Sequence, residues 1–490
     1  MLEYRGMNLE PVIGLEIHVQ LKTKSKMFCS CDNTGEDKPA NTTICPVCMG
    51  HPGTLPVPNA EAIRLGAQAA LALNLHLNER SKFDRKNYFY PDLPKGYQIS
   101  QYDEPLASEG YLEVEVGGEV RKIGIERLHL EEDTAKLSHL GKSSLLDYNR
   151  AGTPLAEIVT KPELKSPAEA KAFLQELRLI MRYLGVSDAD MEKGHLRCDA
   201  NVSLRPAGEG TLYPKTEVKN LNSFRAVERA LAYEIERQGK LWEKGTPPKT
   251  GSTRGWDEKA GETVAQREKE AVHDYRYFPE PDIPPFELSL DQIMGWRASL
   301  PELPAELRKR YYEKGGLTNK VTEFLLANRV VGEFTDRVAD IALSIFEGDV
   351  KSAMRLATNW ILNKYLTILS DMKRSFESEP VSPSQFGDFL QIVVSGRVNS
   401  TNAQVLLKRM VETGKDPATI LADEDLAQGG GGEMSQVIKR VLAAYPAQAA
   451  ELKAGKAVLL KFFVGAVMKE TKGKVDPQAA EELLKSELGK

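Results

Sequence analysis

The chain has 490 residues, of which 41% are hydrophobic and 28% charged, so it is long enough to form two or three separate cores. It contains no uninterrupted apolar run of about 18 residues, so we expect no membrane span. The first residues, MLEYRGMNLEPV, carry charges and lack the apolar segment of a secretion signal, which predicts a cytoplasmic protein. The net charge of −5 excludes a uniformly basic coat for nucleic acid but permits a local basic surface.

The first clear element is a strand over residues 13–21, in which apolar and polar residues alternate without interruption. A period of two predicts one buried face and one polar face. The polar face carries Glu16 and His18, which are two residues apart and therefore point the same way. Such a face is usually just solvated, so the pair is either ordinary surface or part of a site.

Four of the five cysteines follow within one short segment, as Cys29, Cys31, Cys45 and Cys48. A reducing compartment disfavours disulfides, and two close cysteine pairs around a short loop are typical of tetrahedral Zn²⁺. The alternative is a set of four unliganded thiols. Four thiolates leave no coordination position open, so the predicted zinc knuckle over 29–48 is structural and not hydrolytic.

Residues 85–97, RKNYFYPDLPKGY, combine basic and aromatic side chains. Four aromatic residues are unusual for a linker, so we expect an ordered loop. Lys86 and Lys95 could contact phosphate or line a polar channel. The alternative is a pair of surface lysines whose aliphatic stems pack on the protein.

Residues 60–73 are rich in alanine, and helical spacing marks 167–184 and 223–238, so we expect helices there. Strand alternation marks 196–205 and, around a Gly-Gly turn, 112–125. Strands and helices mix here without regular βαβ alternation. This pattern predicts an α+β domain built on an antiparallel sheet.

Three consecutive acids, Glu131, Glu132 and Asp133, follow His129 near the end of a strand-like run. His129 and Glu131 share a face if the strand continues. Like charges this close repel one another, and a hard cation such as Mg²⁺ relieves the repulsion by taking carboxylate oxygens. The alternative is an acidic turn at the end of the strand.

The strand over residues 196–205 has an apolar face that includes Cys198, which we expect in the core. Its polar face carries five residues in register, Arg197, Asp199, Asn201, Ser203 and Arg205. Arginines together with Mg²⁺ suit phosphoryl transfer, because the charge to be stabilised lies on phosphate oxygens.

Glu217 and Lys219 share the face of one further short strand. The segment Gly141-Lys142-Ser143 is not preceded by the glycine that a P-loop needs, since position 136 is lysine. A nucleotide site in this chain would therefore be carried by the sheet.

Prolines concentrated in 279–285 indicate a domain boundary, and beyond them nearly every segment has helical spacing. We predict a sheet domain over 1–295, a helical domain over 296–411 and a small helical tail over 412–490. The glycines at 429–432 predict a flexible hinge.

From residue 437 onward there are ten lysines and arginines against six aspartates and glutamates. Half of the ten basic residues are Lys456, Lys461, Lys469, Lys472 and Lys474. This excess indicates either a nucleic-acid contact or a solvated helix surface.

Eight motifs, in chain order, closely resemble the B subunit of the aspartyl/glutamyl-tRNA amidotransferase. They are VIGLEIHVQL, TICPVCMGHPGTLPVPN with the cysteine pairs, KNYFYPDLPKGYQISQY, HLEEDTAKL, DYNRAGTPLAEIVTKP, LRCDANVSLRP, KTEVKNLNSF and DYRYFPEPD. The resemblance covers most of the sheet domain and resumes near the C-terminus in FFVGAVMKETKGKVDPQ. Eight ordered motifs are far more specific than a single signature.

The resemblance implies a "cradle" domain similar to the glutamine synthetase/guanidino kinase fold, with a sheet-borne site for ATP and Mg²⁺. It implies a ligase of protein biosynthesis that forms a carbon–nitrogen bond with glutamine as the amide donor. The side-chain carboxylate of misacylated Glu-tRNA(Gln) or Asp-tRNA(Asn) would be phosphorylated, and ammonia would then displace phosphate. A separate amidase (A) subunit would supply that ammonia, a small C subunit would complete the heterotrimer, and the tail would bind tRNA.

Carried over residue by residue, the resemblance implies a Mg²⁺ site made by Glu16, His18, Glu131, Glu132 and Glu217. Of these, Glu131, Glu132, Glu217 and His18 are the expected catalytic residues. The strand residues Arg197, Asp199, Asn201 and Arg205 are the expected nucleotide- or substrate-binding set. Lys86 and Lys95 match the mouth of the ammonia channel, and the four cysteines match the family's zinc knuckle.

The chain lacks one part of the complete enzyme and differs from the family at one segment. Nothing in the chain resembles the amidase with its Ser-Ser-Lys nucleophile, so we expect no glutaminase activity from it alone. The glycine run at 429–432 is richer than the family's usual hinge. The competing interpretation of the whole chain is a non-catalytic zinc-knuckle protein that binds RNA.

Overall fold

The computed structural model describes residues 2–4, 7–266, 274–378, 380–424, 426, 431–453, 456, 458–471 and 477–487. Its contacts divide the chain into two compact units, 1–304 and 305–490. Every described strand lies in the first unit, and the second is helical, which confirms the predicted α+β class. No helix in the described part of the chain is long and apolar enough to cross a membrane.

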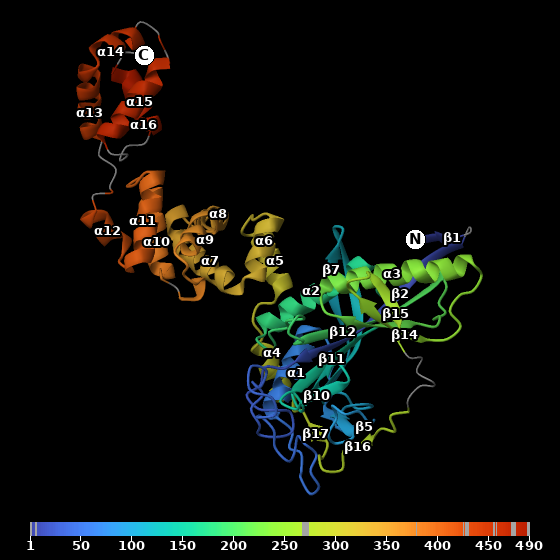
Figure 1. Ribbon diagram of the computed structural model, residues 1–490. Coiled ribbons are helices and arrows are strands. Elements are labelled where there is room, and N and C mark those ends of the chain that lie inside the picture. The colour runs from blue at the N-terminus through green and yellow to red at the C-terminus, as the bar shows by residue number, and fades with distance from the viewer. Residues whose placement is uncertain are drawn as a thin grey trace. The chain divides into compact units, whose positions relative to one another are not determined.

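A large sheet forms the centre of the first unit (Figure 1). Its strands are β1 (Leu2–Tyr4), β2 (Met7–Gln20), β3 (His76–Leu77), β7 (Ala107–Val116), β8 (Glu119–Glu132), β11 (Pro154–Thr160), β12 (Leu196–Pro206), β13 (Thr216–Leu221), β14 (Ser252–Asp257) and β15 (Glu262–Ala265). They follow the order β15-β14-β13-β12-β2-β11-β8-β7-β3, with β1 paired to β2. Neighbours are antiparallel except β13 and β14, so the sheet is antiparallel over nearly all its width.

The strands predicted from alternation are all present. The predicted strand 13–21 corresponds to the second half of β2, and 196–205 corresponds to β12. The segment 112–125 is the turn-proximal part of the β7–β8 hairpin. Gly117 and Gly118 form the turn with φ of +63° and +84°, a backbone region that a side chain would strain.

The predicted helices are α1 (Ala60–Ala72), α2 (Pro167–Tyr183) and α3 (Phe224–Glu243). They pack on the apolar face of the sheet, with α2 and α3 lying across it in Figure 1. Each is preceded by a residue whose side chain accepts a hydrogen bond from a first-turn N–H: Asn59, Ser166 and Ser223.

The core between these helices and the sheet contains the apolar side chains of the alternating strands. Leu15 and Ile17 of β2 and Val202 of β12 are fully buried in it. Cys198 is buried there too, as predicted. The polar half of each strand is thereby forced onto the opposite face.

Short strands outside the large sheet form three smaller sheets. They are β4 (Arg80–Ser81), β5 (Asp84–Asn87), β6 (Tyr97–Ser100), β9 (Lys136–Leu140), β10 (Ser143–Asp147), β16 (Phe278–Pro279) and β17 (Phe286–Glu287). β5 pairs with both β6 and β16, and β6 packs beside β8. The basic and aromatic segment 85–97 is therefore ordered, and it lies next to the residues around 275–279. Helix α4 (Leu290–Ala298) then packs on α1.

Beyond α4 the described residues form helices only, as predicted. They are α5 (Pro304–Glu313), α6 (Asn319–Ala327), α7 (Arg329–Ala342), α8 (Val350–Trp360), α9 (Leu366–Asp371), α10 (Pro383–Val394), α11 (Ser400–Thr413), α12 (Pro417–Asp423), α13 (Gly431–Ala444), α14 (Pro446–Lys453), α15 (Val458–Glu470) and α16 (Pro477–Glu487). Buried aromatic rings of Phe334, Tyr365 and Phe386 pack together between α7 and α10, with centroids 5.3–5.8 Å apart.

The last four helices have an apolar cluster of their own, which includes Ile438, Phe463, Val467 and Leu484. The division of the helical half into 296–411 and 412–490 stays a prediction.

The predicted hinge is only partly described, because Gly429 and Gly430 lie outside the described residues. Gly431 and Gly432 begin α13 and are helical. Of the five tail lysines, Lys472 and Lys474 also lie outside the described residues. The other three, at positions 456, 461 and 469, are exposed.

Candidate functional site

The polar face of the large sheet brings side chains from four strands into one row. On β2, His18 lies opposite Glu157 of β11 on one side and Arg197 of β12 on the other. Glu157 in turn lies opposite His129 of β8. This register sets two histidines and two charged side chains across the middle of the sheet.

His18, Glu131 and Glu157 form the centre of the site. His18 Nε2 lies 3.4 Å from Glu131 Oε1 and 3.3 Å from Glu157 Oε2. On the far side, His129 Nε2 lies 3.1 Å from the same Glu157 oxygen. Both carboxylates are buried, so the acidic segment is not an exposed turn at the end of a strand.

The buried charges of the cluster stabilise one another. Burial by itself lowers the pKa of His129, but Glu157 and Glu131 outweigh it and raise that pKa to about 9. Burial likewise opposes the charged form of Glu157, yet His129 and His18 hold its pKa well below the ordinary value. Buried carboxylates keep their charge only when cations face them, and here the imidazoles do so.

Lys86 adds a third cation from β5. Burial lowers the pKa of Lys86, but Glu131, followed by Tyr277 and Glu157, raises it above its ordinary value. Its ammonium also lies 5.0 Å from the ring centroid of Tyr275. Lys86 is thus a half-buried lysine near the carboxylate cluster, held against an aromatic ring.

A divalent cation fits this cluster. One ligand atom from each of His18, Glu131 and Glu157 lies within 4.8 Å of the others. Mg²⁺ usually takes one or two carboxylates and completes its shell with water or phosphate oxygens. Two buried carboxylates at this spacing match that donor set. His18 would serve as a third donor after giving up its proton, because the metal then replaces it as the cation that faces the carboxylates.

The motifs and spacings of the sequence did not point to Glu157. It is the single acid in the otherwise apolar strand segment LAEIV, where a buried carboxylate requires a partner. A single acid in an apolar strand segment was the one feature of the sequence that could have indicated Glu157 as a site residue. The sequence pattern links His129 only to its neighbour Glu131, and the structure makes it a contact of Glu157 as well.

The other predicted Mg²⁺ residues lie around this cluster. Glu16 shares its strand face with His18 and accepts a hydrogen bond from Asn201 Nδ2 at 2.9 Å. Glu217 lies on β13, which β12 separates from β2, and pairs with Lys219 at 2.8 Å. The three-residue metal group therefore does not include these two glutamates among the residues described.

Glu132 points away from the cluster because consecutive strand residues face opposite sides. It accepts the backbone N–H of Ile99 at 3.0 Å and pairs with Lys95. The Lys95 backbone passes so close to Gly50 that a Cβ on that glycine would lie 2.9 Å from Lys95 Cα. The two predicted channel lysines thus lie on different sides of β8, with Lys95 beside the cysteine loop.

The predicted nucleotide-binding residues follow one another along β12. Arg197 pairs with the buried Asp133 at 2.8 Å, and Asp199 pairs with Lys219 at 2.6 Å. Farther along the strand, Arg205 pairs with Glu10 at 2.7 Å.

Two polar atoms of this row are buried without a hydrogen-bond partner in the part of the chain that is described. They are Arg197 Nε and Asn201 Oδ1. An orphaned donor opposite His18 and an orphaned acceptor farther along the same strand fit contacts to a polar substrate.

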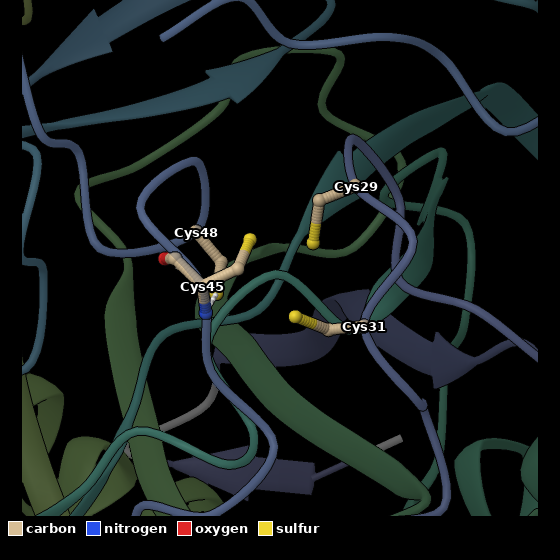
Figure 2. Close-up of side chains that lie close together, drawn as sticks. All are labelled: Cys29, Cys31, Cys45 and Cys48. Atoms are coloured by element: carbon tan, nitrogen blue, oxygen red, sulfur yellow. Dashed lines mark hydrogen bonds between the residues drawn. The ribbon is translucent and has the colours of Figure 1, made fainter.

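The four clustered cysteines point their sulfur atoms toward one another (Figure 2). Their Sγ atoms lie within 4.8 Å of each other, which is compatible with a structural zinc. A hydrogen bond from Cys29, opposed by burial, lowers the pKa of Cys48 to about 5. The backbone N–H of Cys45 and the Lys26 ammonium also favour the Cys48 thiolate.

The position of Lys26 supports a metal bound by the four cysteines. Its side chain is fully buried, and Nζ lies 3.8 Å from Cys48 Sγ and 3.3 Å from the carbonyl oxygen of Tyr148. A buried ammonium is costly unless negative charge faces it. Thiolates bound to Zn²⁺ carry a net negative charge, so the donor set and Lys26 fit the metal-bound form.

Comparison with known proteins identifies the family. A family model described as the GatB/GatE catalytic domain matches residues 11–294, and a model described as the GatB domain matches residues 344–488. Three similar proteins are each named as the B subunit of an aspartyl/glutamyl-tRNA(Asn/Gln) amidotransferase. The Persephonella marina protein is 46% identical over 483 residues, covering 98% of this chain and 100% of that protein. Those of Carboxydothermus hydrogenoformans and Thermotoga maritima are 44% and 45% identical, each covering 98% of this chain and 99% of the relative. The chain therefore belongs to the family of aspartyl/glutamyl-tRNA(Asn/Gln) amidotransferase B subunits.

Proposed function

We propose that this chain carries out the ATP-dependent transamidation of misacylated Glu-tRNA(Gln), Asp-tRNA(Asn) or both. The observation that carries the proposal is the buried cluster of His18, Glu131 and Glu157. It lies beside Arg197, whose Nε is unpartnered among the described residues, and on the same strand face as Asn201 Oδ1, which is also unpartnered there. A non-catalytic RNA-binding protein would have no need to bury two carboxylates and a histidine beside the half-buried His18, so this arrangement weighs against the alternative.

The reaction divides into two steps. A carboxylate is a poor electrophile, so one of its oxygens first attacks the γ-phosphorus of ATP, and ADP leaves. Ammonia then attacks the acyl carbon, and the C–O bond to phosphate breaks to give the amide and inorganic phosphate. Bound Mg²⁺ would neutralise the negative charge that otherwise keeps carboxylate and triphosphate apart.

The chain's own residues have distinct tasks in this proposal. Glu131 and Glu157 with His18 would hold the metal, while Arg197 would donate to phosphate oxygens and Asn201 Oδ1 would accept from an N–H or O–H of the substrate. Both arginine and amide contacts would be made by a rigid strand, which keeps them in place for the transfer. Asp133 fixes the position of the Arg197 guanidinium, because its Oδ2 accepts a hydrogen bond from Arg197 Nη2 at 2.8 Å.

Ammonia would come from a separate amidase subunit within a heterotrimer that also contains a small third subunit. Lys86 and Lys95 would line the polar path by which ammonia enters, on the two sides of β8. A protected path is needed because water would hydrolyse the acyl phosphate.

The decisive test of this function is the dependence of ATP hydrolysis on tRNA. With the complex reconstituted from all three subunits, we expect ADP to form with Glu-tRNA(Gln) or Asp-tRNA(Asn) and not with the uncharged tRNAs. Product analysis of the aminoacyl group with glutamine present should show the amide. ATP hydrolysis at the same rate with and without aminoacyl-tRNA, and no amide, would contradict the proposal.

Deletion of residues 412–490 tests the proposed tRNA contact of the tail. Because exposed Lys456, Lys461 and Lys469 would meet phosphates, the truncated complex should bind tRNA more weakly and with a shallower dependence on salt. Titration at several salt concentrations measures both quantities. An unchanged affinity for tRNA would refute the role of the tail. Substitution of the three lysines by glutamine in the full chain removes their charge without removing the tail domain, so it shows whether the charge itself binds tRNA.

A further inference from the structure

A set of tyrosine rings leads from the surface to the carboxylate cluster. Tyr102 stacks on Tyr277 with centroids 4.4 Å apart and an interplanar angle of 11°. Tyr277 contacts Tyr275 edge to face at 6.1 Å, and Tyr275 contacts Tyr88 in the same way at 6.1 Å. Aromatic pairs in this protein mostly meet edge to face, so the parallel stack is a distinct arrangement.

The outer ring of this stack is accessible to solvent. Tyr102 is 61% exposed, although its backbone is held in place because its N–H donates to the buried Asp84 at 3.0 Å. A flat ring that is stacked on one side and exposed on the other offers its free face to a third flat ring. A nucleobase is such a ring, and stacking on it requires no particular base.

The inner end of the set lies near the proposed reaction centre. Lys86 packs its ammonium over Tyr275 and lies close enough to Glu131 and Glu157 for their charges to act on it. The neighbouring Asn87 fixes the tyrosine segment, since its N–H donates to the carbonyl oxygen of Tyr275 at 3.0 Å and its Nδ2 donates to that of Arg276 at 2.8 Å.

We infer that the open face of the Tyr102–Tyr277 stack binds the 3′-terminal adenine of the aminoacyl-tRNA. The inference rests on the proposed function and adds the subsite for the end of the substrate. In that reaction the carboxylate that is phosphorylated is esterified to the terminal ribose, so its adenine must lie within one aminoacyl-ribose unit of the cluster. Among the described residues, the ring set is an exposed aromatic surface whose inner end lies near that point.

ATP also carries an adenine, but the positions of the polar residues favour the other assignment. The predicted nucleotide-binding residues lie on β12, on one side of β2, whereas Lys86 and the tyrosines reach the cluster beside β8, on the other. The two adenine-bearing substrates would therefore approach the carboxylates from opposite sides. This arrangement leaves the space between them for transfer of the phosphoryl group.

The test measures both substrates in the assembled complex carrying Tyr102→Ala. We expect KM for aminoacyl-tRNA to rise about ten- to hundredfold, which is the usual effect of losing one base–aromatic stack, with KM for ATP unchanged. Tyr102→Phe keeps the ring and should behave like the wild type. Tyr111→Ala, which removes a half-buried tyrosine from β7 outside the ring set, should also leave both KM values unchanged.

A binding experiment without catalysis identifies the partner of the ring. Removal of the terminal adenosine from the tRNA should weaken binding to the wild type, and Tyr102→Ala should add no further loss with the shortened tRNA. Additive losses, or a Tyr102→Ala variant with unchanged tRNA affinity, would overturn the inference. A rise in KM for ATP alone would assign the ring to the nucleotide instead. Failure of the proposed function would look different, because the wild-type complex itself would then form no amide.

Discussion

Replacement of Glu131 by glutamine is expected to reduce amidation by the reconstituted complex by at least about 100-fold, the usual effect of removing one aligned charge from a reaction centre. Glu131 Oε1 lies 3.4 Å from His18 Nε2, Ser100 Oγ donates to Oε2 at 3.3 Å, and the side chain is buried. The amide keeps the volume of the carboxylate but removes the negative charge that a cation requires. The measurement is kcat for amide formation together with the divalent-metal content of the purified complex.

Two further variants show whether the loss of amidation is specific to the proposed site. Glu113→Gln removes an exposed glutamate of β7 and should leave amidation, metal content and tRNA binding unchanged. Glu217→Gln should also reduce amidation, because this side chain with Lys219 borders the row of polar residues on β12. It should retain the metal held at the three-residue cluster.

Aminoacyl-tRNA binding should survive in both active-site variants, since neither removes a proposed tRNA contact. Amidation at the wild-type rate in Glu131→Gln and Glu217→Gln together would refute the metal assignment. Loss of tRNA binding along with amidation would instead indicate that the sheet domain had unfolded, which thermal unfolding of each variant checks.

Replacement of Lys26 by methionine is expected to weaken zinc binding about 10- to 100-fold, as loss of a group that supports metal ligands usually does. The Lys26 ammonium is fully buried 3.8 Å from Cys48 Sγ, and it offsets the net negative charge of four thiolates around Zn²⁺. Methionine fills a similar volume without the charge. Competition with a chromogenic chelator measures the affinity, and Lys24→Met, at an exposed position two residues away, is the matched control.

Cys45→Ser should lower the affinity for zinc more than Lys26→Met does, because three thiolates hold zinc far less well than four. We expect loss of zinc and faster proteolysis within residues 29–58. Helix α1 should remain, since Asn59 caps it and also donates to the carbonyl oxygens of Ser25 and Lys26. Zinc affinity in Lys26→Met equal to that of Lys24→Met would mean that the buried ammonium serves packing alone.

The local features of this site were predictable from the sequence. Alternation with a period of two placed Glu16 and His18 on one face of β2, and Arg197 and Asn201 on one face of β12. Cysteine spacing predicted the sulfur cluster, because residues so close along the chain have few ways to be far apart. These predictions needed only the geometry of single elements.

The three-residue cluster was decided by tertiary structure. β11 inserts between β2 and β8, and this order alone brings Glu157 within 3.3 Å of His18. Strand order depends on how apolar faces pack under helices across the whole domain, which a local pattern does not encode. The opposite orientation of Glu132 follows from the alternation of β8 and is local, but its contacts with Ile99 and Lys95 come from the packing of distant segments.

Local patterns along the chain therefore set the type of each element and the face on which each polar residue lies. Long-range packing set which of these faces meet. Lys86 and Tyr275 are remote in the chain, and they meet because β5 pairs with β16. Contacts between such distant segments follow from burying a shared core, and no spacing of residues along the chain records them.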